Sequence, residues 1–302
     1  MAFTAQDVKN LRERTGVGMM DCKNALTEAN GDMEKAAEIL REKGLAAANK
    51  KAGRIASEGV VLAVSNIGKK VGAVIEVNSE TDFVAKNEGF QNFVKDLADV
   101  VMEQNPADLD ALLEAKMGAG TVADELREKI LVIGENLKIR RFARVEGISS
   151  SYVHAGGSHG VLVEFETTED IAAKPEFATY GKDIAMHIAA ENPSYLDRSE
   201  VPAEVLDKER EILKAQAVNE GKPEAIAEKM VAGRINKFYE TNCLVDQKFV
   251  KDPDFTVAKY TENVAKELGG DIKIVGFVHF EMGEGLEKRS EDFAAEIAGM
   301  VK

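Results

Sequence analysis

The chain has 302 residues, 44% of them apolar and 30% charged, so it can bury a sizeable core and should form two or three units at roughly 100 to 200 residues per domain. Its formal net charge of −14 opposes binding to nucleic-acid phosphates and anionic membranes, and its one basic stretch, at 49–54, is short. Two distant cysteines exclude a disulfide scaffold. The sequence has no long apolar run and no signal-like N-terminus, which predicts a cytoplasmic protein. Together with the net charge, these features predict that the chain binds neither membrane nor nucleic acid directly.

The first 45 residues predict three short helices. Thr4 is placed to cap the first helix, Asn30 and a glycine follow the second, and the third covers 32–44. A bundle this small has a thin core and lacks the walls of a catalytic cleft. We therefore assign residues 1–54 to an N-terminal helical partner-binding module and its linker.

An internal repeat follows this bundle. Residues 58–86 align with 146–174 at a constant offset of 88, which pairs Gly72 with Gly160 and Asp82 with Asp170. After Lys86 one residue is lost; 95–106 then matches 182–193, and 121–146 matches 256–281. Each copy predicts two alternating strands joined by a glycine-containing turn, a helix, and a second helix leading into a third strand. The predicted fold class is α+β, with a duplicated core of two three-stranded antiparallel sheets covered by helices.

The second copy carries an insertion between positions 193 and 256. It contains two charged, helix-favouring stretches with narrow apolar stripes, which predict an antiparallel coiled-coil hairpin projecting from the body. We assign the core halves to 55–145 and to 146–198 with 246–284, and the hairpin to 199–245. The last unit, 285–302, predicts a loop and a C-terminal helix with Met300 on its apolar face.

No motif in the chain predicts catalysis. The sequence GAGTVA at 118–123 has the letters of a dinucleotide fingerprint, but the residues before it predict a helix, whereas the fingerprint needs a strand. His154 and His159 stand at opposite ends of a predicted turn without a clear third metal ligand, and His187 and His279 fit packed positions. We expect neither an enzyme nor a bound cofactor or metal.

The stretch SETDFVAKNEGF, residues 79–90, places Phe83 directly after a predicted strand. The second copy has Ile171 at the aligned position, so the aromatic ring distinguishes the two copies. In one interpretation Phe83 packs on its own core and Asp82 caps a helix. In the other, this acidic and aromatic pair is a wedge presented to a partner on a rigid strand-to-helix junction. Composition does not separate the two.

Five stretches together resemble the bacterial elongation factor Ts family: LRERTGVGMMDCKNALTEANGD, EVNSETDFVAKNEGF, HIAAENP, GKPEAIAEKMVAGRINKF and MGEGLEK. The resemblance runs from the N-terminal module to the last helix, and its TDFVA block is highly specific. It implies a guanine nucleotide exchange factor for elongation factor Tu, with a ubiquitin-associated-like N-terminal bundle, a duplicated core, a coiled-coil hairpin and a C-terminal helix that touches the partner.

The resemblance also implies partner contacts, carried over by matching position. Asp82 and Phe83, flanked by Thr81 and Val84, would enter the GTPase near its Mg²⁺ and switch elements. Contacts with the GTP-binding domain would come from Arg12, Met19, Met20 and Lys23 of the first module. His154 would grip another domain of the partner, and Met300 belongs to the C-terminal helix. The turn HAGGSHG around His154 departs from the family pattern by its extra glycine and second histidine.

Two other classes of function stay open at this point. The bundle and hairpin would also suit a chaperone or nascent-chain adaptor without exchange activity, which should show an exposed apolar groove. An enzyme built on GAGTVA or on the histidines would need a bound cofactor.

Overall fold

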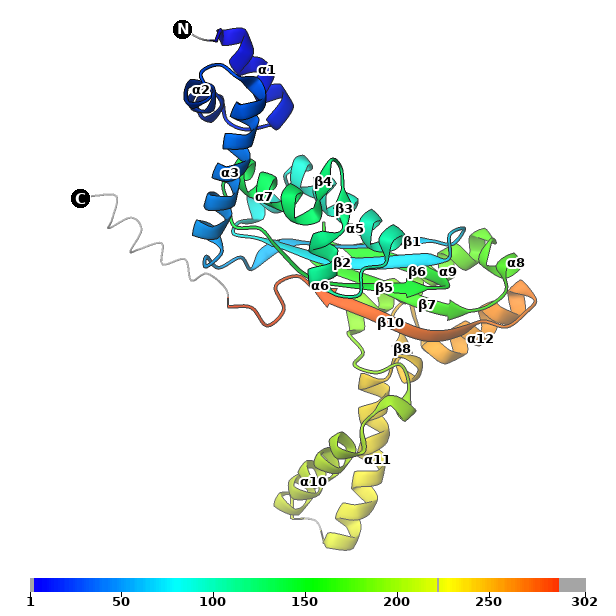
Figure 1. The fold of residues 1–302 in the computed structure, drawn as a ribbon. Coiled ribbons are helices and arrows are strands. Elements are labelled where there is room, and N and C mark those ends of the chain that lie inside the picture. Colours follow the sequence, from blue (N-terminus) through cyan, green and yellow to red (C-terminus); the bar gives the residue numbers. More distant parts are fainter. Residues whose placement is uncertain (1–2, 222, 288–302) are drawn as a thin grey trace.

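The computed structural model describes residues 3–221 and 223–287, and Figure 1 shows their helices arranged around antiparallel sheets. This mixed architecture confirms the predicted α+β class. The N-terminal helices lie on one side of the sheets, and a helical pair projects from the other (Figure 1). Most of the predicted C-terminal unit, including Met300, lies outside the described residues.

The N-terminal helices are α1 (Ala5–Thr15), α2 (Met19–Glu28) and α3 (Met33–Lys51). Thr4 caps α1 as predicted, through a reciprocal pair of hydrogen bonds with Asp7. The predicted extent of the third helix, 32–44, is too short, because α3 continues to Lys51 against α7 (Val122–Ile133). A methyl group on Gly44 would lie 3.5 Å from the Leu131 side chain, so this glycine allows close helix packing instead of ending the helix.

The two halves of the core follow the same order of strands and helices except for α6, which occurs in the first half alone, and the helical insertion of the second half. The first half contains β1 (Glu58–Asn66), β2 (Val71–Ser79), α4 (Asp82–Ala85), α5 (Glu88–Gln104), α6 (Leu109–Glu114), β3 (Lys116–Met117), β4 (Gly120–Thr121), α7 and β5 (Lys138–Glu146). The second contains β6 (Ile148–His154), β7 (His159–Glu166), α8 (Glu169–Ala172), α9 (Pro175–Glu191), β8 (Lys248–Phe249), β9 (Asp252–Thr256), α12 (Val257–Leu268) and β10 (Lys273–Glu281). The three-stranded sheets have the orders β1-β2-β5 and β10-β7-β6, and β3 pairs with β4 and β8 with β9.

The two sheets pack against each other through a small apolar layer formed by Val61, Ala63, Val74 and Leu162. Two glycines at equivalent places in the repeat permit this contact. A methyl group on Gly72 would lie 2.6 Å from Leu162, and one on Gly160 would lie 2.4 Å from Val61. The turn between β6 and β7 also binds the first half directly, since the Val61 N–H donates to the Gly157 carbonyl at 2.8 Å.

Each half has a larger core of its own between its sheet and its helices. In the first half, α5 places Phe90, Phe93 and Leu97 at helical spacing against the sheet. In the second half, Phe177 and Tyr180 of α9 do the same. Every residue of β2 is buried, so the first half offers a firmly packed strand from which the next segment emerges.

The position of the one-residue difference between the halves needs correction. The sequence alignment puts it after Lys86. In the structure, α4 starts after Thr81 and α8 starts after Thr168, so the offset is already 87 at this point. Buried Val84 therefore matches buried Ile171, and exposed Phe83 matches the exposed residue before Ile171, which is an aspartate. Two residues separate strand and helix in both halves, whereas β2 has nine residues and β7 has eight, so the extra residue of the first half lies at the end of β2.

The insertion of the second half folds as α10 (Ala203–Asn219) and α11 (Glu224–Asn242), flanked by 3₁₀ turns at Arg198–Glu200 and Leu244–Asp246. The two helices pack along each other and extend away from the sheets (Figure 1). Their assignment as a coiled coil stays a prediction. Among the residues that the structure describes, no helix has the length and apolar character needed to cross a membrane.

Candidate functional site

Phe83 has the largest exposed fraction of the large apolar side chains that the structure describes, at 80%. It lies in the first turn of α4, directly after the buried strand β2. The next residue, Val84, is 8% exposed and packs into the core of the first half. The interpretation in which Phe83 packs on its own core is therefore wrong, because Val84 fills that position.

Asp82 is the first residue of α4 but does not cap the helix. Thr81 is the N-cap residue, and the Asp82 carboxylate accepts a hydrogen bond from Lys86 Nζ at 2.6 Å, one turn along the helix. This hydrogen bond lowers the pKa of Asp82, so the carboxylate is ionised at neutral pH. The exposed start of α4 thus combines an anion paired with Lys86 and a solvent-facing aromatic ring.

The loop before α4 is held by Glu135, which follows α7. Its Oε2 accepts the backbone N–H groups of Glu80 and Thr81, both at 3.0 Å, and its Oε1 accepts the Thr81 hydroxyl at 2.7 Å. The Thr81 hydroxyl is therefore bound to this carboxylate and makes no capping bond to α4. One partly buried carboxylate satisfies two backbone donors that the turn from strand to helix leaves without a partner in regular structure.

Glu80 extends this set of contacts to a third chain segment. Its Oε1 accepts the backbone N–H of Asn136 at 2.6 Å and the guanidinium of Arg54 at 3.3 Å. Asn136 Nδ2 in turn donates to the Arg54 carbonyl at 2.8 Å. Since Arg54 lies between α3 and β1, the connections α3–β1, β2–α4 and α7–β5 meet beside the exposed helix.

The four predicted contacts of the N-terminal module, Arg12, Met19, Met20 and Lys23, are all exposed. The accessible fractions of the two methionines are 53% and 63%. Met19 and Lys23 are four residues apart on α2 and share a helix face. The helices that carry these residues, α1 and α2, lie at the end of α3 away from the connection that contains Arg54 (Figure 1). Flexible thioether side chains suit an adaptable contact surface.

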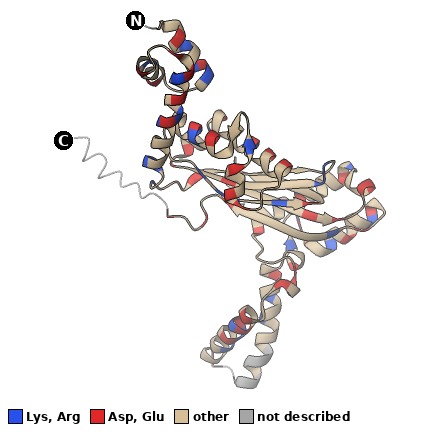
Figure 2. Cartoon of the chain, in the orientation of Figure 1, with Lys and Arg blue, Asp and Glu red and all other residues tan. Residues whose placement is uncertain are grey.

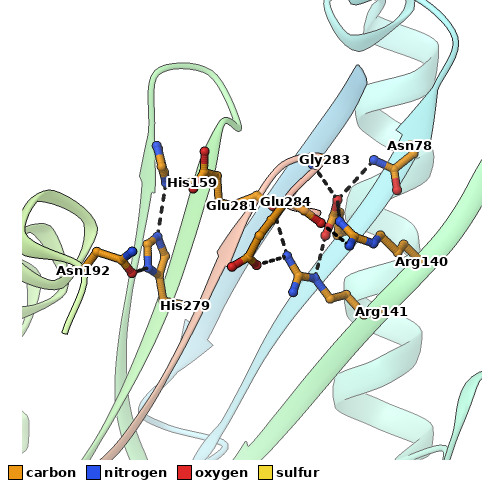
Figure 3. A network of polar contacts seen from close by, with 10 residues as sticks. Asn78, Arg140, Arg141, His159, Asn192, His279, Glu281, Gly283 and Glu284 are labelled. Atoms are coloured by element: carbon orange, nitrogen blue, oxygen red, sulfur yellow. Dashed lines mark hydrogen bonds and ion pairs between the residues drawn. The ribbon is translucent and has the colours of Figure 1, made fainter. Parts of the chain in front are cut away.

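His154 lies at the exposed turn between β6 and β7. Its Nδ1 is 3.0 Å from the Tyr152 hydroxyl, and its ring centre is 6.2 Å from that of His159. His159 Nδ1 instead lies 3.2 Å from His279 Nε2, and His279 Nδ1 lies 3.0 Å from the Asn192 side chain (Figure 3). Burial lowers the pKa of His279. Within residues 3–221 and 223–287, no group of three or more His, Cys, Asp or Glu is placed to hold a metal ion.

The other residues considered for a chemical role are engaged in packing, hydrogen bonding or helix capping within the chain. His187 is fully buried, its Nε2 is 3.0 Å from Gln247 Oε1, and its Nδ1 accepts the Val250 N–H at 3.2 Å. The GAGTVA stretch forms the turn between β3 and β4 and the start of α7, so the predicted helix before it ends early, at Glu114. Thr121 within this stretch caps α7 with its hydroxyl.

The basic stretch at 49–54 is largely engaged within the chain. Lys51 Nζ donates to the Ile130 carbonyl at 3.2 Å, and burial lowers the pKa of Lys51. Arg54 pairs with Glu80, as described above. Figure 2 shows acidic and basic residues interspersed along the helices of the N-terminal bundle and of α10. Two of the cations in the stretch thus have internal partners.

A buried carboxylate on β2, that of Glu76, joins the two halves. Its Oε1 accepts the Gly283 N–H at 2.8 Å and a nitrogen of Arg140 at 2.9 Å, and its Oε2 accepts Arg141 Nε at 2.6 Å. Figure 3 shows these contacts converging between strands of both halves. Gly283 follows β10, so the carboxylate ties the end of the second sheet to the first.

Sequence reasoning missed the structural roles of Glu135 and Glu76. Both are single glutamates in a chain with 53 acidic residues, and neither belongs to a motif. A signal for Glu135 was present in the repeat, since at an offset of 135 the second half has Gly270 in its place. This difference lies in a connection between two elements, whereas the repeat was recognised from its strands and helices.

Comparisons with known proteins add a family-level finding. A family model described as Elongation factor TS matches residues 80–284. The chain is 52% identical over 306 residues to Elongation factor Ts of Clostridium kluyveri strain ATCC 8527, with 99% of each chain covered. It is 50% identical over 307 residues to Elongation factor Ts of Syntrophotalea carbinolica, with 100% of each covered. The similarity to Elongation factor Ts of Clostridium perfringens strain 13 is 52% over 302 residues, covering 99% of each.

Proposed function

This chain belongs to the elongation factor Ts family and acts in translation elongation, and from that premise we propose that it binds elongation factor Tu and promotes the release of its GDP. In this proposal Asp82 and Phe83 enter the partner near its Mg²⁺ and switch region. The chain breaks no chemical bond in this role. It acts as a guanine nucleotide exchange factor.

The observation that supports this proposal most directly is the 80% exposure of Phe83 at the start of α4. Burial of a phenylalanine side chain stabilises a contact by about 1.5 to 3 kcal/mol, and the free chain leaves that free energy unused. The ring stands on a helix whose next residue is anchored in the core, so little ordering is required when a partner binds. An exposed, pre-ordered aromatic side chain fits a wedge.

Thermodynamic linkage explains how such a wedge would release a nucleotide. An exchange factor binds the nucleotide-free partner more tightly than the GDP-bound partner, and GDP weakens the grip of the factor by the same ratio. In GTPases, backbone amides, a lysine and Mg²⁺ hold the phosphates. A wedge that displaces these groups weakens GDP binding, with each tenfold change corresponding to about 1.4 kcal/mol.

The other proposed contacts would supply affinity. Arg12, Met19, Met20 and Lys23 on the N-terminal helices, together with His154 at the β6–β7 turn, are exposed and belong to elements other than α4. Contacts remote from the nucleotide would bind GDP-bound and nucleotide-free partner alike, so they would strengthen the complex without changing the ratio of the two affinities. We therefore assign exchange to α4 and attachment to these surfaces.

The test is Phe83→Ala in a stopped-flow assay of fluorescent GDP release from elongation factor Tu. From the burial free energy of the ring, we expect the maximal stimulated rate to fall by about 10- to 100-fold. Phe255→Ala, which truncates a second phenylalanine on β9 with 37% exposure, is the matched control and should exchange normally. Normal GDP release by Phe83→Ala would contradict the proposal. Unchanged release together with suppressed aggregation of unfolded proteins would favour an adaptor or chaperone.

A further inference from the structure

We infer that Glu135 is a positioning residue for Phe83, a role that rests on the proposed function of Phe83 as the exchange wedge. Its carboxylate holds the backbone of residues 80–81 and thereby fixes the direction in which the first turn of α4 presents the aromatic ring. Glu135 itself need not touch the partner. It acts through the loop to which it is bonded.

The exposed ring depends on its backbone for orientation. Phe83 is 80% exposed, so side-chain packing within the chain contributes little to its position. α4 spans only Asp82–Ala85, and a helix of one turn does not hold itself in water. The loop and α4 are held by Val84, which packs into the core, by the Ser79 hydroxyl, which donates to the Thr81 carbonyl at 2.9 Å, and by the three hydrogen bonds that Glu135 accepts from Glu80 and Thr81.

The contact between the two loops is reciprocal. Glu135 accepts the N–H of Glu80 at 3.0 Å, while Glu80 accepts the N–H of Asn136 at 2.6 Å. Each connection therefore supplies a carboxylate to the backbone of the other. Charge-assisted hydrogen bonds of this kind are about twice as strong as neutral ones. These reciprocal hydrogen bonds hold the β2–α4 loop against the end of α7.

The second half serves as an internal comparison in which both features are missing. At the position of Glu135 it has Gly270, where an added methyl group would lie 2.5 Å from Ile171 Cδ1. The apolar side chain after the β7–α8 connection thus packs over the glycine. The residue that corresponds to Phe83 is Asp170, which presents no aromatic ring. The positioning carboxylate and the exposed aromatic side chain occur together in one half only.

The absence of tryptophan from the chain makes a direct test possible. Phe83→Trp introduces a sole tryptophan at the proposed wedge, and its time-resolved fluorescence anisotropy in the free protein reports the local motion of α4. Glu135→Ala is introduced into this background and also into the chain with Phe83 intact, where fluorescent GDP release is measured. Glu135→Gln is the conservative variant, because its amide oxygen can accept both N–H groups and its nitrogen can donate to the Thr81 hydroxyl.

A control and a milder variant accompany these substitutions. Thr167→Val removes the hydrogen bond from the Thr167 hydroxyl to the Asp271 carbonyl, at 2.8 Å, in the corresponding loop of the second half, and should change neither readout. Thr81→Val removes only the hydroxyl contact of Glu135. It should shift both readouts in the same direction by a smaller amount, and it keeps the test decisive if Glu135→Ala does not fold by far-ultraviolet circular dichroism.

We expect Glu135→Ala to increase the fast, local component of the anisotropy decay of the introduced tryptophan. The same substitution should lower the maximal GDP release rate about tenfold. Glu135→Gln should restore both quantities to within about twofold of the parent. A tenfold loss corresponds to about 1.4 kcal/mol. An anisotropy decay unchanged by Glu135→Ala overturns the positioning role. Increased motion with normal GDP release supports the positioning role and instead overturns the assignment of exchange to Phe83.

Discussion

Replacing Glu76 by glutamine should destabilise the core, because this buried carboxylate pairs with two arginines of β5 and also accepts the Gly283 N–H of the other half. The Glu76 side chain is 0% exposed, whereas those of Arg140 and Arg141 are 20% and 28% exposed. Glutamine can keep its oxygen near the Gly283 N–H, but its nitrogen then faces the donor Arg141 Nε, which lies 2.6 Å from the present oxygen. The variant loses the charge and turns one hydrogen bond into a contact between two donors.

The expected magnitude follows from these contacts. A hydrogen bond to a charged group contributes about 1.5 to 3 kcal/mol, and removal of one partner of a buried ion pair costs about 3 to 5 kcal/mol. Because both guanidinium groups keep some access to water, the loss should not exceed the lower end of the range for a buried ion pair. We expect Glu76→Gln to lower the free energy of unfolding by about 2 to 3 kcal/mol, measured by urea denaturation with an unchanged m-value.

Acidification offers a second measurement on the same residue. Burial alone would raise the pKa of Glu76, but the hydrogen bonds from Gly283, Arg140 and Arg141 outweigh it and hold the pKa below the ordinary value of 4.5. The carboxylate therefore stabilises the fold above pH 4.5, and this contribution is lost as the pH falls through the lowered pKa. The difference in unfolding free energy between the parent and Glu76→Gln should be constant above about pH 5 and shrink in acid.

The control for Glu76 is an exposed pair. Glu103→Gln breaks the contact of Glu103 with Lys69 at 3.1 Å, where both side chains are more than half exposed, and should change stability by less than about 0.5 kcal/mol. A loss for Glu76→Gln as small as that of the control would refute the reasoning, as would a difference that grows in acid.

Two further predictions concern packing and partner binding. Gly160→Ala should lower the free energy of unfolding by about 1 to 3 kcal/mol, measured by urea denaturation, because its methyl group would lie 2.4 Å from Val61. The control, Gly233→Ala on α11, has open space around it and should be neutral or stabilising. Equal effects of the two substitutions would contradict this account of the interface. Met20→Ala should weaken binding to elongation factor Tu about tenfold, because the Met20 side chain is 63% exposed in the free chain and would be buried by the partner. The GDP release rate at saturating factor should stay unchanged. Titration of the stimulated rate separates the two quantities, and a lower plateau would place Met20 in the exchange step.

Strands and long helices of this chain were predictable because their residue patterns carry the period of the structure. The alternating run that became β2 and the apolar spacing of α5 are examples. The end of α3 was not predictable, since Gly44 looks like a helix stop until the neighbouring α7 is known. Tertiary packing overrides a local propensity of about 1 kcal/mol.

The candidate site was predictable in location but not in construction. The sequence marked Phe83, and its exposure separates the two interpretations that composition left open. Matching letters, Asp82 with Asp170 and Lys86 with Lys174, misplaced the one-residue difference, because a few identities in and beside a one-turn helix are weaker evidence than the burial that pairs Val84 with Ile171. Glu135 acts through backbone groups, and which donors a loop leaves unpaired is known only from coordinates.

Gly72 and Gly160 bear on how a duplicated protein can diverge. Each glycine faces a large side chain of the opposite half, Leu162 for Gly72 and Val61 for Gly160. A mutation that adds bulk at either glycine cannot be offset within its own copy and needs a matching reduction in the other. The two copies are therefore free to drift apart at their outer loops, where one became a carrier of an exposed aromatic ring, but they must evolve jointly along their shared face.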